Sequence, residues 1–335
     1  MAKAKKKRVK PLMLHKSQGE VFFDKSRFKV LACGRRWGKA LDVDTPIFTT
    51  EGWKTMGTIA PGDKVFSPTG KPVNVRAVSE VYENRPCYEI QFFDGESLVA
   101  DANHQWQVWS KPKRDGIRRG NRGITWAGEF AGSILHTDEL YDKFLQQDIQ
   151  SYWAIHATAP LQTDPQKLPI DPYVFGAWVV SDPSRKGNMV KLKFPETVSE
   201  FGARGYDLKY KGVKYDWYCR RLKKEIADLG WESIEEIPEV YQKSSLSDRV
   251  ALLQGIIEGG GFYQRNGKLQ IKCKSAGLCR DIVSLFYSLG QKVEIKAEPY
   301  QRGGKTQDFF RLIFRPCQGL VATRYRRVNK KLAEA

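Results

Sequence analysis

The feature that most constrains this chain is a phosphate-loop motif that breaks off at residue 40. An apolar run at 28–32 precedes Gly34-Arg35-Arg36-Trp37-Gly38-Lys39, as a buried strand precedes a nucleotide-binding loop. Position 40 is Ala, however, and offers no hydroxyl to hold Mg²⁺. Residues 41–52 contain a Pro and a Gly where the phosphate-binding helix should begin, which favours short strands and turns. We therefore predict that one ancestral protein ends at Lys39 and another begins at Ala40.

The loop also departs from the spacing of a complete nucleotide site. Cys33 occupies the place of the first Gly of the full motif, so Gly34 to Lys39 spans one residue fewer. A functional nucleotide site stays open as the alternative to a remnant. The residues of the predicted remnant loop are Gly34, Arg35, Arg36, Gly38 and Lys39.

Residues 11–39 resemble the start of phage terminase large subunits, the ATPases that pump DNA into capsids. The resemblance rests on residues 14–23 and on the loop, because that family carries Gly-Arg-Arg-aromatic-Gly-Lys followed by Ser or Thr at this place. The acidic strand end and the nuclease region of that family do not follow. We expect no ATP hydrolysis from this chain alone.

Positive charge is concentrated in four segments of the chain. Lys and Arg number 56 against 38 Asp and Glu, which gives a formal charge of +18. The basic segments are 3–10, 111–122, 209–224 and 324–331. This pattern predicts a polyanionic partner, with a merely soluble basic protein as the alternative. No apolar stretch approaches the ~20 residues of a membrane span, so we expect no membrane contact and a location in the cytoplasm of a phage's host cell.

The six cysteines show no metal-binding or disulfide pattern. They stand at 33, 87, 219, 273, 279 and 317, without C-x-x-C spacing and without a matching pattern among the four His. We predict reduced, half-buried thiols and neither a zinc site nor a disulfide framework.

Residues 40–160 have a pattern typical of an all-β unit. Short runs rich in Val, Ile, Phe and Tyr alternate with turns that contain Pro-Gly, Ser-Pro and Asp-Gly. The expected strands include 64–66, 73–75, 77–82, 87–93 and 97–100. Asp101-Ala102-Asn103-His104 follows the last of them. Without further context, such a His is most simply a packed or solvated residue.

Two segments of this unit resemble sequence blocks of inteins, self-excising segments with a horseshoe-shaped β fold called Hint. Residues 41–65 match the first block, and Asp101 to His104 falls where the second block carries Thr-x-x-His. The resemblance implies that His104 donates a proton to the nitrogen of the Lys39–Ala40 peptide. Such a donor is needed because an amide must lose resonance and gain a proton to break. The resemblance implies no cofactor for splicing.

Two residues depart from the common intein pattern. Ala40 stands where most inteins carry a Cys or Ser, and a methyl group cannot attack the preceding carbonyl. Asp101 replaces the Thr, and Trp106 lies two residues beyond His104. The combination resembles the intein class with a non-nucleophilic first residue, in which a late Cys attacks the junction and the Trp supports the site. An engineered knockout of an original Cys or Ser at position 40 is the alternative.

The remaining residues contain an internal repeat. Apolar helices are predicted at 173–180 and 251–258, with Gly176 and Gly255 placed so that the two helices can approach closely. A Gly turn and a strand signal follow each helix, at 189–194 and 268–272, and each half also holds an amphipathic helix that ends in Leu-Gly. Over 160–331 these features resemble a LAGLIDADG homing endonuclease of the dodecapeptide type. The resemblance implies a two-repeat α+β saddle that straddles double-stranded DNA.

The catalytic acids of that endonuclease family are missing. Such enzymes place one carboxylate at the foot of each central helix to hold paired metal ions. The corresponding positions here are Ser181 and Gly260. Asp182 and Glu258 lie nearby, and we expect them to solvate helix ends rather than bind metal. Nuclease activity, and with it a need for Mg²⁺, is the alternative.

The combined prediction is the N-terminal precursor part of an intein-interrupted terminase large subunit. Its fold is mixed, with a terminase segment at 1–39, an incomplete Hint horseshoe at 40–160 and an endonuclease-like saddle at 161–335. Splicing still requires a late Cys and a terminal His-Asn. We do not assign the late Cys to Cys317, because that residue lies inside the expected endonuclease tail. The predicted partners are therefore a C-terminal intein fragment with its C-extein, for splicing in trans, and double-stranded DNA. An active nuclease and a truncated or mutated, splicing-inactive precursor remain alternatives.

Overall fold

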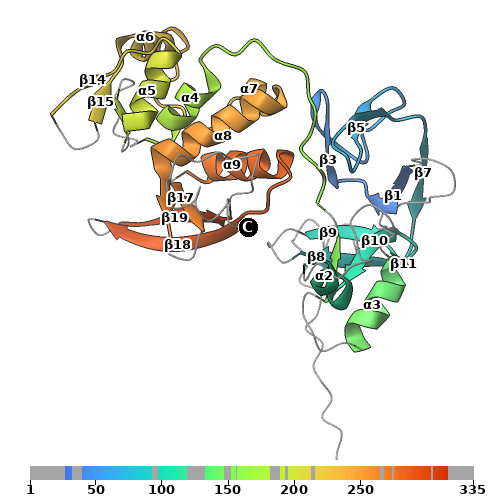
Figure 1. Ribbon diagram of the computed structural model, residues 1–335. Helices are drawn as coiled ribbons and strands as arrows, with labels where there is room; N and C mark the ends of the chain where they lie inside the picture. Colours follow the sequence, from blue (N-terminus) through green and yellow to red (C-terminus); the bar gives the residue numbers. More distant parts are fainter. Residues whose placement is uncertain are drawn as a thin grey trace, which may run out of the picture. The chain divides into compact units, whose positions relative to one another are not determined.

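The computed structural model is a mixed α/β structure with several antiparallel sheets (Figure 1). It describes residues 27–31, 40–92, 97–118, 133–146, 152–155, 157–181, 189–192, 195–212, 216–264, 268–273, 275–302 and 305–315. The chain forms two compact units. The first comprises Met1–Thr49, Trp53–Val65 and Val73–His156, and the second comprises Thr50–Gly52, Phe66–Pro72 and Ala157–Ala335. The predicted division at 160, the horseshoe and the saddle stay predictions.

Short antiparallel strands dominate the first unit. One sheet has the order β7-β1-β2-β9-β8, a second has β4-β3-β5-β6, and a third has β11-β10-β12. The strands are β1 (Arg27–Leu31), β2 (Ala40–Asp42), β3 (Pro46–Thr49), β4 (Gly52–Thr55), β5 (Lys64–Phe66), β6 (Pro72–Asn74), β7 (Val78–Glu83), β8 (Cys87–Gln91), β9 (Ser97–Asp101), β10 (Gln105–Ser110), β11 (Ser133–His136) and β12 (Trp153–Ile155). The strands expected between 64 and 100 are thereby confirmed.

The expectation that this unit is all-β is wrong. It contains two helices, α2 (Lys111–Arg118) and α3 (Thr137–Gln146). Helix α3 has Asp138 and Glu139 in its first turn and Lys143 in its last. This charge order complements the helix dipole and so stabilises the helix.

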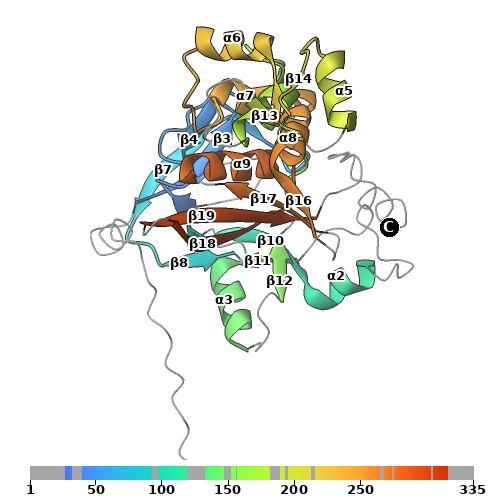
Figure 2. The same ribbon diagram turned by 90° about the vertical axis from the view of Figure 1, so that its left-hand side faces the viewer.

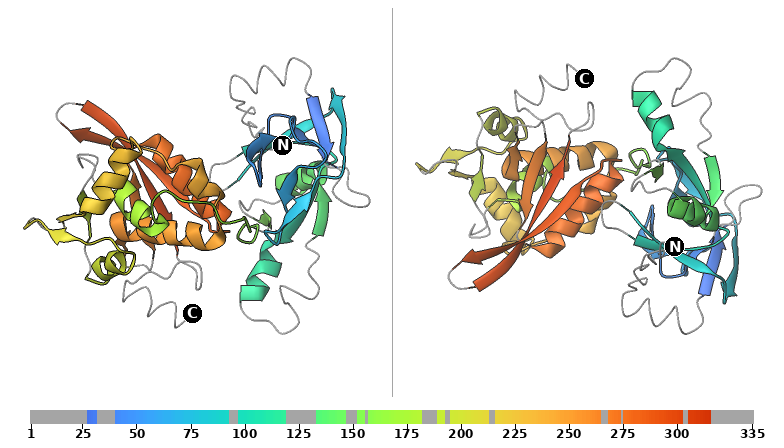
Figure 3. Two further views of the ribbon diagram at one scale, coloured as in Figure 1. Left: turned by 90° about the horizontal axis from the view of Figure 1, so that it is seen from above. Right: turned by 90° about the horizontal axis from the view of Figure 1, so that it is seen from below.

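Two halves of helix and sheet make up the second unit. Its sheets have the orders β13-β15-β14 and β16-β17-β19-β18. Helix α9 covers one face of the second sheet (Figure 2), and β18 and β19 form its long hairpin (Figure 3). The elements are α4 (Pro172–Val179), β13 (Met189–Lys191), α5 (Pro195–Ala203), β14 (Lys209–Tyr210), β15 (Asp216–Tyr218), α6 (Arg220–Asp228), α7 (Glu239–Lys243), α8 (Leu246–Gly260), β16 (Gly261–Tyr263), β17 (Leu269–Cys273), α9 (Ala276–Ser288), β18 (Glu294–Arg302) and β19 (Lys305–Phe314).

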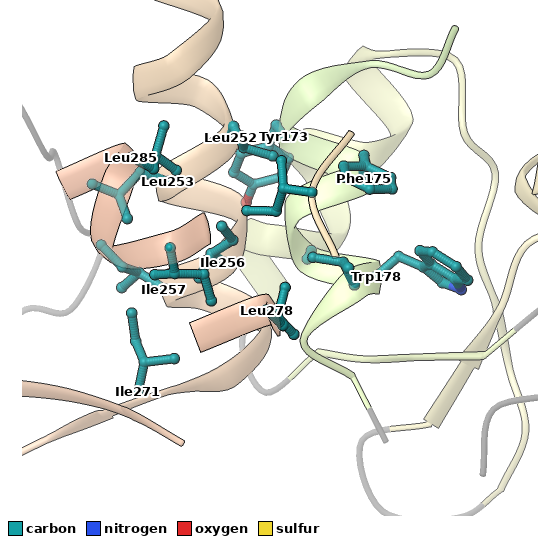
Figure 4. Close-up of a cluster of buried hydrophobic side chains, with 14 of the residues drawn as sticks. Tyr173, Phe175, Trp178, Leu252, Leu253, Ile256, Ile257, Ile271, Leu278 and Leu285 are labelled. Carbon is teal, nitrogen blue, oxygen red and sulfur yellow. The ribbon is translucent and has the colours of Figure 1, made fainter. Parts of the chain in front are cut away.

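Helices α4 and α8 cross at the centre of the second unit's core (Figure 4). A Cβ atom added to Gly176 would lie 2.3 Å from the carbonyl oxygen of Leu252, and one added to Gly255 would lie 2.0 Å from that of Tyr173. Only glycine permits backbones to meet this closely. The predicted close approach at Gly176 and Gly255 is therefore confirmed.

The described cysteines carry free thiols. Cys87 is half-buried as predicted, whereas Cys219, Cys273 and Cys279 are buried more completely than expected. Burial raises the pKa of Cys273 to about 12 and that of Cys279 to about 11, so both thiols stay protonated. Within the described ranges, no helix combines the length and apolar character needed to cross a membrane.

Candidate functional site

Strand β2 brings position 40 next to the end of β9. On one side β2 pairs with β1, with Val30 opposite Ala40, and on the other it pairs with β9, with Leu41 opposite Ala100. In an antiparallel pair the next positions face each other in turn, so Ala40 lies opposite Asp101. Lys39 and the rest of the remnant loop, Gly34, Arg35, Arg36 and Gly38, lie outside the described residues.

Asp101 begins a tight turn that leads to His104. Its carbonyl accepts the His104 N–H at 3.0 Å, and its Oδ1 accepts the Asn103 N–H at 2.7 Å. The Asp101 side chain is 1% exposed, and its Oδ2 forms an ion pair with Arg85 Nε at 2.5 Å. An aspartate can therefore build this turn through a short side chain that bonds to the backbone two residues on.

His104 and Trp106 lie against each other at the end of this turn. Their ring centroids are 4.6 Å apart at an interplanar angle of 55°, and His104 is only 6% exposed. The Trp106 Nε1–H donates to Thr137 Oγ1 at 3.0 Å. The structure thus brings His104 and Trp106 together in the turn that Asp101 begins, and the strand register places Asp101 opposite position 40.

Sequence analysis missed three residues that support this turn: Arg85, His136 and Thr137. His136 Nδ1 lies 3.0 Å from the Asn103 carbonyl oxygen, and Thr137 Oγ1 lies 3.2 Å from that of His104. Both come from a segment more than thirty residues further along the chain. Of the three residues, only Arg85 could have been found from the sequence, because it is a charged residue just before the expected strand at 87–93.

Cys87 lies on the other side of Asp101. It stands opposite Asp101 in the β8–β9 register. Burial, followed by the negative charges of Asp101 and Asp42, raises the pKa of this thiol to about 12. A thiol rather than a thiolate is a poor nucleophile, so Cys87 does not supply an attacking group at neutral pH.

The second candidate site lies at the feet of α4 and α8. Ser181 is 4% exposed, and its hydroxyl donates to the Ala177 carbonyl at 2.7 Å. Gly260 ends α8, where an added Cβ atom would lie 3.1 Å from the Val180 side chain. A side chain at position 260 would thus require the Val180 side chain to shift by a few tenths of an ångström. Asp182 lies outside the described residues.

The expectation that Glu258 solvates a helix end is wrong. Glu258 is 3% exposed, and its Oε2 accepts hydrogen bonds from the hydroxyls of Tyr173 and Thr197. A buried carboxylate needs hydrogen-bond donors that replace water. The donors here come from α4 and α5, so Glu258 links α8 to both helices. Among the described residues, no group of three or more His, Cys, Asp or Glu is placed to hold a metal ion.

One face of the four-stranded sheet β16-β17-β19-β18 carries a row of cations. Lys272 pairs with Arg311, and Arg311 pairs with Lys296 on its other side. Neighbouring Ile271 and Leu312 are fully buried in the core under the helices. Because side chains alternate along a strand, the three cations point to the opposite face. We call Lys272, Arg311 and Lys296 the cation row.

Comparison with known proteins found no family model that matches this chain. Two curated relatives are replicative DNA helicases DnaB. The helicase of Mycobacterium intracellulare is 28% identical over an alignment of 269 residues that covers 77% of this chain and 43% of the helicase. That of Mycobacterium leprae (strain TN) is 49% identical over 81 residues, which are 24% of this chain and 13% of the helicase. The chain spans less than half the length of these relatives.

Two solved structures are also similar to parts of the chain. The MchDnaB-1 intein is 49% identical, covers 21% of this chain and 53% of its own, and has a TM-score of 0.20. A variant of I-DmoI in complex with its target DNA is 12% identical, covers 43% of this chain and 86% of its own, and has a TM-score of 0.30. Both TM-scores are too low to establish a common fold. The similarity to the intein is one of sequence over part of the chain.

Proposed function

We propose that this chain contains an intein-type splicing module that begins at Ala40 and is followed by a DNA-binding, homing-endonuclease-like module. The observation that carries the proposal is the pairing of β2 with β9. It sets Ala40 opposite Asp101, the first residue of the turn that holds His104. We infer from this register that His104, at the end of the turn, is the proton donor that cleavage of the Lys39–Ala40 amide requires.

Each residue of the turn has a separate role in this proposal. His104 donates a proton to the departing nitrogen of Ala40, which converts a poor amine leaving group into a good one. Asp101 shapes the turn through its bond to Asn103, and Trp106 packs on the imidazole. The attacking Cys and the terminal Asn come from a further segment, on the same or a separate polypeptide.

The host protein is proposed to be a phage terminase large subunit. Support comes from the loop Gly34 to Lys39, which a downstream residue with a hydroxyl or thiol would complete after excision. The relatives point to a second kind of host, a replicative helicase. A stretch of 81 residues, 13% of the helicase of Mycobacterium leprae, is short enough to be an inserted module. Similar modules in two unrelated hosts are what a mobile intein would leave.

The module after residue 160 is proposed to bind double-stranded DNA without cutting it. The cation row supports binding, because Lys and Arg contacts to phosphates need no metal site. Loss of nuclease activity is supported by Ser181, whose hydroxyl is bonded back to its own helix, and by the Val180 side chain beside Gly260. Glu258 accepts two hydroxyl hydrogen bonds within the core, which favours a structural role over metal binding.

A nucleophile placed at position 40 tests the splicing proposal. The variant Ala40→Cys is incubated with dithiothreitol, and fragments are identified by mass spectrometry. We expect release of residues 1–39, because a thiol next to the junction amide can form a thioester that the reagent cleaves. The double variant Ala40→Cys/His104→Ala is the matched control and should cleave far more slowly. If the bond that follows Lys39 stays intact in the single variant after prolonged incubation, the proposal is contradicted.

A further inference from the structure

We propose that His136, Thr137 and Asp138 form a clamp that positions His104 for its reaction. The clamp comprises the last residue of β11 and the first two residues of α3. This inference rests on the proposed function, since it takes His104 as the group that acts on the junction. The clamp residues are positioning residues that act through the turn.

The clamp binds three consecutive carbonyl groups of the turn. Asp138 N–H donates to Ala102 O at 3.2 Å and Thr137 N–H donates to His104 O at 3.0 Å. Between them, His136 Nδ1 lies 3.0 Å from Asn103 O. None of the three peptide planes can rotate without breaking one of these bonds. The backbone that carries His104 is therefore fixed by a segment distant in sequence.

The hydroxyl of Thr137 joins Trp106 to the backbone of His104. It donates to His104 O at 3.2 Å and accepts the Trp106 Nε1–H at 3.0 Å. A hydroxyl can do both at once because it offers one proton and two lone pairs. Thr137 is only 2% exposed, so water does not replace these bonds readily. Thr137 thereby fixes the position of the Trp106 ring, which packs on the His104 ring, relative to the turn.

His136 supplies the remaining bond as a donor. A carbonyl oxygen can only accept, so the proton of the imidazole lies on Nδ1, and Nε2 faces the amide Nε2 of Gln105 at 3.3 Å. The backbone N–H of His136 donates to Glu139 Oε2 at 2.9 Å. This bond is one half of a capping box at the start of α3. The same helix start therefore fixes both the imidazole and the two N–H donors of the clamp.

The clamp is tested with paired variants in the Ala40→Cys parent. Thr137→Val removes the hydroxyl but keeps the branched shape, and Thr137→Ser restores the hydroxyl. His136→Leu removes the donor, and His136→Asn places an amide N–H near the position of Nδ1. We expect Thr137→Val and His136→Leu to slow release of residues 1–39 by roughly 10–100-fold. Small misplacements of a catalytic group produce a loss of this size. Ser and Asn should restore most of the rate.

A second measurement separates this inference from the proposed function. Proton exchange of the Trp106 indole N–H and the ring resonances of His104 are followed by NMR in the uncleaved protein. We expect faster indole exchange in Thr137→Val and shifted His104 resonances in Thr137→Val and His136→Leu, but parent-like values in the Ser and Asn variants. If these signals change while no variant cleaves, the clamp stands and the splicing proposal fails. If Thr137→Val and His136→Leu match the parent in the NMR signals, or cleave as fast as a parent that does cleave, the clamp is refuted.

Discussion

At the scale of single residues, the buried Asp101 is paired with the charge of Arg85. Its carboxylate is 1% exposed and pairs with Arg85, which is 30% exposed and also lies over the Tyr82 ring. Removing one partner of a buried pair leaves the other charge uncompensated. We predict that Arg85→Met lowers the free energy of unfolding by up to about 3 kcal/mol, the lower end of the range for buried pairs, because Arg85 is partly exposed.

Urea unfolding monitored by tryptophan fluorescence measures this effect. Arg76→Met, at an exposed arginine of the same unit, is the matched control and should change little. Adding Asp101→Asn to Arg85→Met should recover part of the loss, because the uncompensated charge is then gone. Equal stability of Arg85→Met and the parent would show that solvent already screens Asp101.

A second single-residue prediction concerns acid stability. Lys54 Nζ donates to Asp63 Oδ1 at 2.5 Å and Ala60 N–H donates to Asp63 Oδ2 at 2.9 Å, and these bonds lower the pKa of Asp63. A carboxyl group with a lowered pKa stabilises the fold above its unfolded-state pKa, and this contribution is lost as the pH falls through the folded-state pKa. Thermal unfolding should therefore show that the parent loses stability below about pH 4, and that Asp63→Asn loses less over the same interval.

The role of a single residue could be predicted from the sequence only where its partners are close to it in the chain. Asp101, His104 and Trp106 are within six positions, and one motif contains all three. His136 and Thr137 reach them only because β10 and β11 pair, with Gln105 opposite His136. The role of Glu258 escapes prediction for a related reason. Its position near the end of α8 is visible in the sequence, but the hydroxyls of Tyr173 and Thr197 arrive from two other helices.

At the scale of elements, the α4–α8 crossing depends on its glycines. The Cβ atom of Gly255→Ala would meet the Tyr173 carbonyl, and a backbone atom cannot move aside as a side chain can. We predict that Gly255→Ala destabilises the protein by about 1–3 kcal/mol, the usual result of overpacking a core. Gly202→Ala in α5, where an added Cβ meets nothing within 4 Å, is the control and should be neutral or stabilising by up to about 1 kcal/mol. Urea unfolding compares the two, and equal effects would contradict the role of the crossing.

Elements with strong internal periodicity were predictable, and those defined by their ends were not. The helices around 173–180 and 251–258 have continuous apolar character, and both are present as α4 and α8. Helix α3 has apolar residues at helical spacing, but Tyr141, Phe144 and Leu145 are exposed, so burial of this stripe does not hold the helix in place. Its start is instead fixed by the bond between His136 N–H and Glu139, a signal that a β-rich context concealed.

At the scale of the whole molecule, the cation row predicts how affinity for DNA responds to salt. The triple variant Lys272→Gln/Arg311→Gln/Lys296→Gln should weaken binding to duplex DNA. It should also reduce the slope of log affinity against log salt by about 0.9 for each phosphate that the protein no longer neutralises. The control Lys167→Gln/Arg280→Gln/Lys292→Gln removes the same charge from exposed positions outside the four basic segments. Fluorescence anisotropy over a salt series measures both. Equal slopes in the two variants would show that net charge, and not the cation row, determines binding.

The last prediction is that the molecule binds DNA but does not cut it. Two-metal hydrolysis needs a carboxylate at the foot of each central helix, and the chain has Ser181 and Gly260 there. Duplex DNA that carries an uninterrupted terminase coding sequence should therefore stay intact with Mg²⁺ at protein concentrations that saturate binding. Glu258→Gln distinguishes the two roles of the remaining acid. If Glu258 only accepts bonds from Tyr173 and Thr197, this variant lowers stability and leaves the DNA intact. Metal-dependent cutting by the parent that Glu258→Gln abolishes, at a temperature at which circular dichroism shows the variant folded, would instead make this buried carboxylate a metal ligand.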